Sequence, residues 1–433
     1  MDRIVIHSDL NNFFASVERK LHPELVGVPL AVGGNSEERK GIVLAKSEEA
    51  KRFGVKTGET LWQAKRKCPG LVVVPTSFPE YTKYSRMARA IYAEYTDLLE
   101  PFGIDECWLD VTHSTKIFPA YAGDMYSGEG EQTYSEGFLR FLGDTLRERV
   151  KAELGLTVSV GVSFNKVFAK LGSDLKKPDG TTVISRAGYK KIVWPLPVDD
   201  LLFVGSATAQ KLRRSGINTI GALAALDGDH ARRLLGKTGA TLLKYARGED
   251  DDPVRGIGER EELKSVGNSL TYAHDLVTPE EVKTNIYVLC ESVASRLREA
   301  EVGRADTVHL WVRSNDMTTV SMQKKVRPTV LCGEIAEHAF ALFCEKIKPP
   351  FKVRAMGVTV SGFDKNLSQL TMDQLDGRYE KRERAERAVD EIRKKYGYSF
   401  VQRGITAADP EAAHTDIKGA RLKKPDGGGD NQN

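Results

Sequence analysis

Residues 104–111 read IDECWLDV, and apolar and polar side chains alternate along this stretch. The alternation predicts a strand. Asp105 and Glu106 are neighbours, so they would point to opposite faces of that strand, and both reach one site only at a sheet edge or where the strand is distorted. Nearer the amino terminus, residues 4–6 predict a short buried strand that ends at Asp9. Carboxylates from two distant strands are therefore candidates for one site.

Three carboxylates with few competing histidines suit Mg²⁺, which prefers hard oxygen ligands and takes further ligands from water and from substrate phosphates. The alternative interpretation is that Asp105 and Glu106 are solvated charges on an exposed sheet edge. The spacing alone favours neither.

The flanking sequence predicts further elements of an α+β fold. Apolar spacing predicts helices at residues 13–20, 80–100, 138–153 and 166–171, and further strands at residues 72–75 and 157–163. Residues 41–69 predict a small helical insert between two strands. Residues 114–137 carry Gly, Ser and Pro without a period, which predicts an exposed, mobile loop. This order predicts a sheet with helices on one face, of the split βαβ kind.

Length and composition indicate a multidomain globular protein. The chain has 433 residues, which predicts about three domains, and 40% of them are hydrophobic. A net charge of only +4 excludes a uniformly basic nucleic-acid coat, but it permits a basic groove beside an acidic site. The five cysteines form no Cys-x-x-Cys pair, and no apolar run is long enough for a membrane span. We therefore expect a cytoplasmic protein without disulfides, signal peptide or membrane anchor.

The carboxyl-terminal part has a different organisation. An acidic stretch at residues 249–252, followed by Gly256 and Gly258, predicts a polar linker. Beyond it, strands are predicted at 307–313, 318–325 and 353–360, and helices at 280–297 and 333–346, which suits a compact α+β domain. From residue 366 we expect a tail with one charged helix at 378–395 and a disordered Gly-rich and Asn-rich end.

Three stretches carry a family resemblance: DLNNFFASVE at 9–18, IDECWLD at 104–110 and GVSFNKVFAK at 161–170. In their order and separation they resemble the Y-family translesion DNA polymerases, most closely the bacterial DNA polymerase IV type. The resemblance runs from about residue 3 to 365. It implies a template-directed DNA polymerase that extends primers past damaged bases, with low fidelity and no proofreading.

The same resemblance implies a right-hand polymerase. Its parts would be a ferredoxin-like palm (1–10 and 76–173), small fingers (11–75), a helix-hairpin-helix thumb (174–249), a linker (250–262), a little finger domain (263–365) and a tail (366–433). Its partners would be primer-template DNA and deoxynucleoside triphosphates.

Matching positions imply the site residues. Asp9, Asp105 and Glu106 match the catalytic carboxylates, which with the Leu10 carbonyl would bind two Mg²⁺ ions. Among the substrate contacts, Phe14 matches an aromatic gate that excludes a 2′-hydroxyl, and its neighbour Phe13 is either a further contact or a core side chain. Lys166 matches a triphosphate-binding lysine, whereas Lys170 and Lys177 are expected at the surface or on the DNA backbone.

The chain also departs from the family pattern. Glu48 stands where a phosphate-binding Tyr is usual, Lys51 stands for an Arg, with Arg52 as a substitute, and Gly103 replaces a Ser. Glu48 would repel a triphosphate at close range. These departures favour a second hypothesis, a non-catalytic DNA-binding protein with the same fold. A third is a metal-dependent cyclase or nuclease with a palm-like sheet, although Phe14 and the thumb weigh against it.

Other segments are predicted to hold DNA or a partner. Residues 201–217 resemble a helix-hairpin-helix, in which amides near Gly205 and the charge of Lys211 meet a phosphate. Further phosphate contacts are predicted at Lys264, Lys324 and Arg327, where a solvated surface is the alternative. Residues 368–373 (SQLTMD) look like a degenerate sliding-clamp peptide, with Gln369, Leu370 and Met372 as contacts. The protein is otherwise expected to be a monomer.

Overall fold

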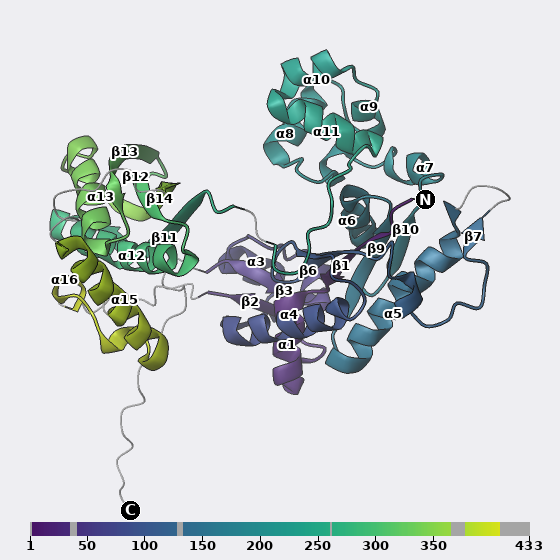
Figure 1. Ribbon diagram of the computed structural model, residues 1–433, viewed down its shortest axis with the longest axis horizontal. Coiled ribbons are helices and arrows are strands. Elements are labelled where there is room, and N and C mark those ends of the chain that lie inside the picture. Colours follow the sequence, from purple (N-terminus) through teal and green to yellow (C-terminus); the bar gives the residue numbers. More distant parts are fainter. Residues whose placement is uncertain (1, 35–40, 128–132, 260–261, 365–376, 408–433) are drawn as a thin grey trace, which may run out of the picture. The chain divides into compact units, whose positions relative to one another are not determined.

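The computed structural model describes residues 2–34, 41–127, 133–259, 262–364 and 377–407 (Figure 1). The chain divides into two compact units, and of the described residues 2–34 and 42–259 lie in the first unit while 262–364 and 377–407 lie in the second. The first unit contains the carboxylate stretches, and the second contains the carboxyl-terminal α+β domain. No helix in the described ranges is long and apolar enough to cross a bilayer.

A five-stranded sheet in the order β10-β9-β1-β6-β5 forms the centre of the first unit. Its strands are β1 (Val5–Leu10), β5 (Leu99–Pro101), β6 (Glu106–Asp110), β9 (Val158–Ser163) and β10 (Thr181–Ile184). The central strand β1 pairs antiparallel with β6 and β9, while β10 is parallel to β9. Because β10 completes this sheet, the sheet extends beyond residue 173, where the palm was expected to end.

Helices cover both faces of this sheet. On one face α1 (Phe13–Leu21), α4 (Phe78–Ala93) and α5 (Glu136–Leu154) share a core with alternate residues of the strands, Ile6 and Leu109 among them. On the other face α6 (Lys166–Leu175) packs through Ala169 against Val5 and Trp108. The expectation of helices on one face only is therefore wrong. The cause is visible in β1, which is buried on both sides.

A small three-stranded sheet in the order β3-β2-β4 lies in the segment that was expected to form the fingers. Its strands are β2 (Leu30–Gly33), β3 (Val43–Lys46) and β4 (Val72–Val74), and two helices, α2 (Glu48–Arg52) and α3 (Leu61–Lys67), lie between β3 and β4. A short 3₁₀ turn (Pro23–Leu25) precedes β2. The subdomain has its own small core, which includes Val43, Ala50 and Leu61.

The loop expected at 114–137 is partly ordered structure. It contains a 3₁₀ turn (Thr115–Ile117) and a strand pair, β7 (Tyr126–Ser127) with β8 (Thr133–Tyr134). Tyr134 is buried against Phe138, and Ser135 then caps α5. The prediction of a wholly exposed loop was wrong because it ignored this aromatic anchor.

The segment expected to form the thumb continues after β10 as a cluster of short helices with its own core. They are α7 (Tyr189–Val193), a 3₁₀ turn (Val198–Asp200), α8 (Ser206–Arg214), α9 (Ile220–Ala224), α10 (Gly228–Leu235) and α11 (Lys237–Arg247).

The segment that follows α11 packs against the elements of the five-stranded sheet instead of crossing solvent. Val254 is buried beside Val5 and Trp108, and the Arg255 amide and guanidinium both bind the Glu100 carboxylate. The amide of Ile257 bonds the carbonyl of Asp97 at 2.8 Å. Residues 253–257 are thus part of the first unit. The polar composition had predicted a solvated linker here, and that prediction is wrong.

The second unit is a four-stranded sheet in the order β11-β14-β12-β13 with helices packed on it. The elements are β11 (Ser265–Leu276), α12 (Pro279–Ala300), β12 (Arg304–Ser314), β13 (Thr319–Thr329), α13 (Cys332–Lys346) and β14 (Val353–Asp364). Val308, Leu310 and Val312 of β12 share a core with α12 and α13.

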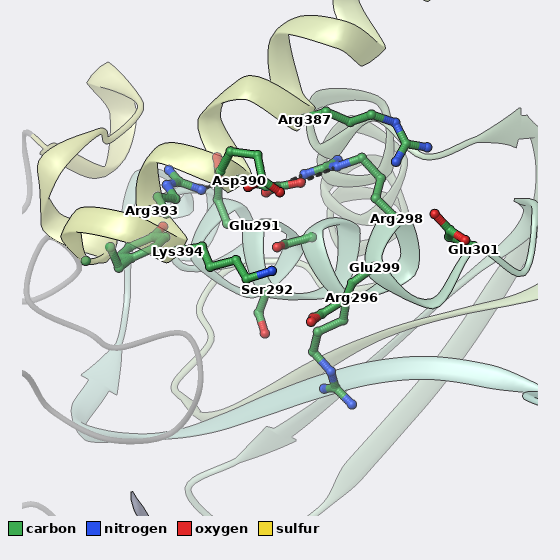
Figure 2. Close-up of a pocket in the computed structure, with 14 residues that line it drawn as sticks. Glu291, Ser292, Arg296, Arg298, Glu299, Glu301, Arg387, Asp390, Arg393 and Lys394 are labelled. Carbon is green, nitrogen blue, oxygen red and sulfur yellow. Dashed lines mark hydrogen bonds and ion pairs between the residues drawn. The ribbon is translucent and has the colours of Figure 1, made fainter. Parts of the chain in front are cut away.

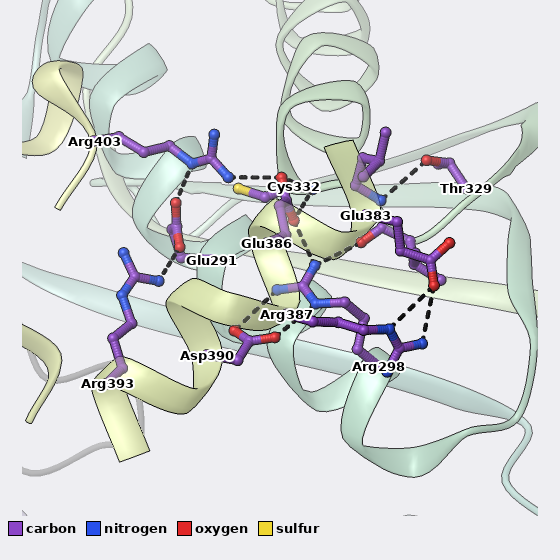
Figure 3. Close-up of polar contacts among 12 residues, drawn as sticks. Glu291, Arg298, Thr329, Cys332, Glu383, Glu386, Arg387, Asp390, Arg393 and Arg403 are labelled. Atoms are coloured by element: carbon purple, nitrogen blue, oxygen red, sulfur yellow. Dashed lines mark hydrogen bonds and ion pairs between the residues drawn. The ribbon is translucent and has the colours of Figure 1, made fainter. Parts of the chain in front are cut away.

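The charged helix predicted in the tail belongs to this second unit. It is α15 (Arg378–Tyr396), followed by a 3₁₀ turn (Tyr398–Phe400) and the short α16 (Gly404–Ala407). Buried ion pairs attach it to α12, where Glu291 pairs with Arg393 and Arg403 while Arg298 pairs with Asp390 and Glu386 (Figure 3). The description of residues 377–407 as a tail is therefore corrected.

A pocket of about 720 Å³ opens between α12 and α15 (Figure 2). Five basic and five acidic side chains line it, so the lining has no net preference for an anion or a cation: Arg296, Arg298, Arg387, Arg393, Lys394, Glu291, Glu299, Glu301, Asp390 and Glu391.

Candidate active site

Strand pairing brings the three predicted carboxylates together. Asp9 of β1 lies directly opposite Glu106 of β6, so the two side chains share the face that α6 covers. Asp105 precedes the first residue of β6, and its carbonyl accepts the Leu10 amide at 3.0 Å. Because Asp105 stands outside the strand, the alternation of strand side chains does not separate it from Glu106. This position just outside the strand allows Asp105 and Glu106 to serve one site although they are neighbours in the sequence.

Gly103 has an unusual backbone conformation just before Asp105 and β6. Its φ is +148°, a backbone conformation that side-chain-bearing residues rarely adopt, and its carbonyl accepts a bond from Arg89 at 2.5 Å. A Ser at this position would be strained. The departure from the family pattern therefore has a conformational cause and does not remove a carboxylate.

Two lysines complete the cluster. Lys170, one turn into α6, is 2.7 Å from Glu106 and 3.4 Å from Asp9, measured from Nζ to a carboxylate oxygen. Lys177, just beyond α6, lies 2.6 Å from the same Asp9 oxygen. Asp174 pairs with both ammonium groups. The expectation that these lysines serve the surface or the DNA backbone is therefore wrong.

The electrostatics of the cluster follow from its burial. Burial, then a hydrogen bond with Asp9, raises the pKa of Glu106 to about 7. Burial, then the charge of Asp9, raises the pKa of Asp105. Burial alone would raise the pKa of Asp9 as well, but its bond with Glu106 and the charges of Lys177 and Lys170 outweigh it and leave this pKa lowered.

These residues fit a divalent cation. Burial and then Asp9 raise the pKa values of Glu106 and Asp105, and a cation bound beside these carboxylates would offset both effects. The donors are carboxylate oxygens, which Mg²⁺ prefers. Within the described ranges, no three acidic, His or Cys side chains are already drawn together closely enough to hold a metal ion. The ammonium groups of Lys170 and Lys177 lie against the carboxylates of Asp9 and Glu106.

Lys166 does not join this cluster. Its Nζ binds both oxygens of the buried Glu100 at 2.9 and 2.8 Å and lies 4.8 Å from the Trp108 ring centroid. The structure thus places it with the segment at 253–257, and its role as a triphosphate contact stays a prediction. The pairing of Lys177 with Asp9 could not be predicted from the sequence, because the two residues are 168 positions apart.

The fingers explain the second departure, Glu48. It is the first residue of α2, which Ser47 caps, and its carboxylate accepts bonds from Asn12 at 3.0 Å and from Lys51 at 3.4 Å. An acidic residue at this position also complements the helix dipole. Glu48 is therefore satisfied within the fold. Lys51, in turn, is engaged with it, whereas Arg52 is exposed.

The two neighbouring phenylalanines have different environments. Phe13 is buried in the core beside the five-stranded sheet, which agrees with its alternative interpretation as a core side chain, and its role as a substrate contact stays a prediction. Phe14 is half-buried and stacks on Tyr81, with ring centroids 4.1 Å apart and planes at 11°. The Tyr81 hydroxyl donates to the buried Glu18. Tyr81 and Glu18 thus fix the Phe14 ring, and the sequence analysis named neither.

The predicted DNA contacts are scattered over both units. Gly205 is exposed at the start of α8, and Lys211 is exposed on the same helix. Lys264 and Arg327 are exposed as well. Lys324 lies opposite Val308, whose side chain packs into the helix-covered core. Lys324 therefore lies at the edge of the sheet face that the helices cover. Its neighbour Lys325 lies on the opposite, uncovered face.

Gln369, Leu370 and Met372 lie outside the described residues.

Comparisons with known proteins agree with this architecture. A model described as the impB/mucB/samB family matches residues 8–174, and one for the C-terminal domain of that family matches residues 263–372. The DNA polymerase IV of Acetivibrio thermocellus is 45% identical over 94% of this chain and 98% of its own. The chain belongs to the Y family of DNA polymerases. DNA polymerase IV 1 of Bacillus subtilis is 39% identical, with 95% and 94% covered.

Solved Y-family structures share the fold. A Y-family chimera of Dbh and Dpo4 superimposes with a TM-score of 0.70 at 24% identity, covering 84% of this chain and all of the other. DinB from Sulfolobus solfataricus gives a TM-score of 0.53 at 25% identity, over 84% of this chain and all of its own. The α+β multidomain prediction and the family resemblance are confirmed.

Proposed function

We propose that this Y-family polymerase extends primers past damaged template bases by two-metal nucleotidyl transfer, with low fidelity and without proofreading. The observation that carries the proposal is the meeting of Asp9, Asp105 and Glu106 beside Lys177. The three carboxylates and the Leu10 carbonyl would hold two Mg²⁺ ions. When bound, such ions lower the pKa of the primer 3′-hydroxyl and neutralise charge on the triphosphate.

The chain's own residues then orient the nucleotide. Lys177 has 30% of its side chain exposed, against 13% for Lys170, so it is the better placed to exchange Asp9 for triphosphate oxygens. Phe14 would lie against the sugar, held by Tyr81 beneath it. These residues bind and position the substrates.

Primer extension with Mg²⁺ and four deoxynucleotides, on an intact template and on one with an abasic site, tests the proposal. Extension past the abasic site is expected. Duplex binding without any extension would favour the non-catalytic hypothesis, and cleavage of DNA or cyclisation of a triphosphate would favour the third. Cytoplasmic location, a monomeric state and clamp binding through residues 368–373 stay predictions.

Replacing Phe14 with Ala should raise ribonucleotide incorporation relative to deoxynucleotide incorporation by about 10- to 100-fold, because the ring no longer blocks a 2′-hydroxyl. The measurement is the ratio of kcat/KM values for the two nucleotides. Phe203→Ala, at an exposed thumb position, is the control and should leave the ratio unchanged. If Phe14→Ala also leaves it unchanged, the gate lies elsewhere.

A chain truncated after Gly258 should keep the carboxylate cluster but lose most of its DNA affinity. Truncation at this point retains Val254 and Arg255, which pack on the palm. Each phosphate contact contributes about −0.9 to the slope of log affinity against log salt, so the intact protein should show the steeper slope. Equal slopes and affinities would mean that residues 263–364 do not hold DNA.

A further inference from the structure

Helix α3 of the fingers presents a large aromatic side chain to solvent. Leu61 and Ala64 bury one side of the helix, while Trp62 on the other side is 65% exposed. The guanidinium of Arg66, one turn later, lies 4.9 Å from the centroid of the indole ring. Trp62 and Arg66 therefore form one cation-aromatic pair on the surface, which we call the α3 stack.

The helix that carries the α3 stack is well anchored. Thr60 and Gln63 form a capping box at its first turn. At its end, Lys67 donates to the carbonyl of Gly54 at 3.0 Å and pairs with Glu59. The exposed indole is thus presented by a fixed element and not by a loose loop.

The surroundings of the α3 stack are strongly basic. Residues 42–75 contain seven Lys and Arg against three Glu, a net charge of +4 that equals the net charge of the whole chain. Lys65 and Arg66 are exposed, and they follow Trp62 by three and four positions, the spacing of neighbours on one side of a helix. A purely apolar partner surface would have to desolvate these charges, whereas a polyanion with flat rings would meet both features at once.

We propose that the α3 stack is a platform for single-stranded DNA, on which an unpaired base stacks while the neighbouring basic side chains hold the backbone. Every base has a π-face, so such a platform tolerates any sequence. A strand without a partner strand is the template beyond the primer end. The assignment to template rests on the proposed polymerase function, but the binding of single strands does not.

The test compares binding of three fluorescent DNA probes to the full chain: a single-stranded oligonucleotide, a primer-template with a 5′ template overhang of about eight nucleotides, and the matching blunt duplex. Trp62→Ala should weaken binding of the first two by about 5- to 100-fold and leave the blunt duplex unchanged. Trp62→Phe, which keeps a flat ring, should restore most of the affinity. Phe53→Ala is the matched control, since Phe53 is a 54% exposed aromatic of the same subdomain.

The outcomes separate the two claims. Unchanged binding of Trp62→Ala to single strands, an equal loss in Phe53→Ala, or an equal loss on the blunt duplex would each overturn the platform. A wild-type chain that fails to extend primers, yet binds single strands through Trp62, would refute the polymerase proposal and leave the platform standing.

Discussion

Replacing Asp105 with Asn should lower the rate of primer extension by at least about 1,000-fold, or about 4 kcal/mol in the activation barrier. Asn has nearly the same shape, so the corner between Gly103 and β6 is kept. The loss is of one negative charge in a cluster whose proposed task is to hold two divalent cations. The measurement is single-turnover extension at saturating Mg²⁺ and nucleotide.

The affinity for primer-template DNA should change by less than about threefold in Asp105→Asn, because charges elsewhere hold the duplex backbone. Asp144→Asn is the matched control, since Asp144 lies on α5 and pairs with Arg147. It should extend primers at the wild-type rate. Wild-type turnover in Asp105→Asn would show that the metal assignment is wrong.

The sequence predicted the carboxylates of this site better than its cations. Asp9, Asp105 and Glu106 stand at strand ends, and strand ends are readable from local alternation. Lys170 and Lys177 face them only because α6 lies across the sheet next to β1 and β9. That crossing depends on contacts between segments more than 160 positions apart, which no local pattern contains.

Buried charges explain the other failures. Lys166 was assigned to the triphosphate because it matches a lysine of the family pattern, and nothing in the local sequence marks Glu100 as its buried partner. Helix α15 was assigned to a tail because its own charged side chains lie on every side of it. This leaves no apolar stripe that would predict a buried face. Its partners on α12 are themselves charged, so periodicity alone does not reveal them.

The second large effect is expected on stability, from the ion pairs that attach α15 to α12. Replacing Arg298 with Ala should lower the free energy of unfolding of the second unit by about 3–5 kcal/mol. The Arg298 side chain is 3% exposed, donates to Asp390 at 2.7 and 3.0 Å, and also donates to the Val330 carbonyl at 2.8 Å (Figure 3). Its removal leaves the carboxylates of Asp390 and Glu386 without this cation. Glu386 would keep Arg403 as a partner, and Asp390 would lose the most.

Hydrogen exchange of the amides of β12 and β14 in the full chain measures this loss, because it reports the opening of the second unit alone. Protection there should fall by about 100-fold or more in Arg298→Ala. Arg382→Ala is the control, since its pair with Glu334 is exposed and should contribute less than about 1 kcal/mol. A double-mutant cycle with Asp390→Ala should recover a coupling of about 1–3 kcal/mol. Equal, small losses in Arg298→Ala and Arg382→Ala would mean that the attachment of α15 to α12 contributes little to the stability of the second unit.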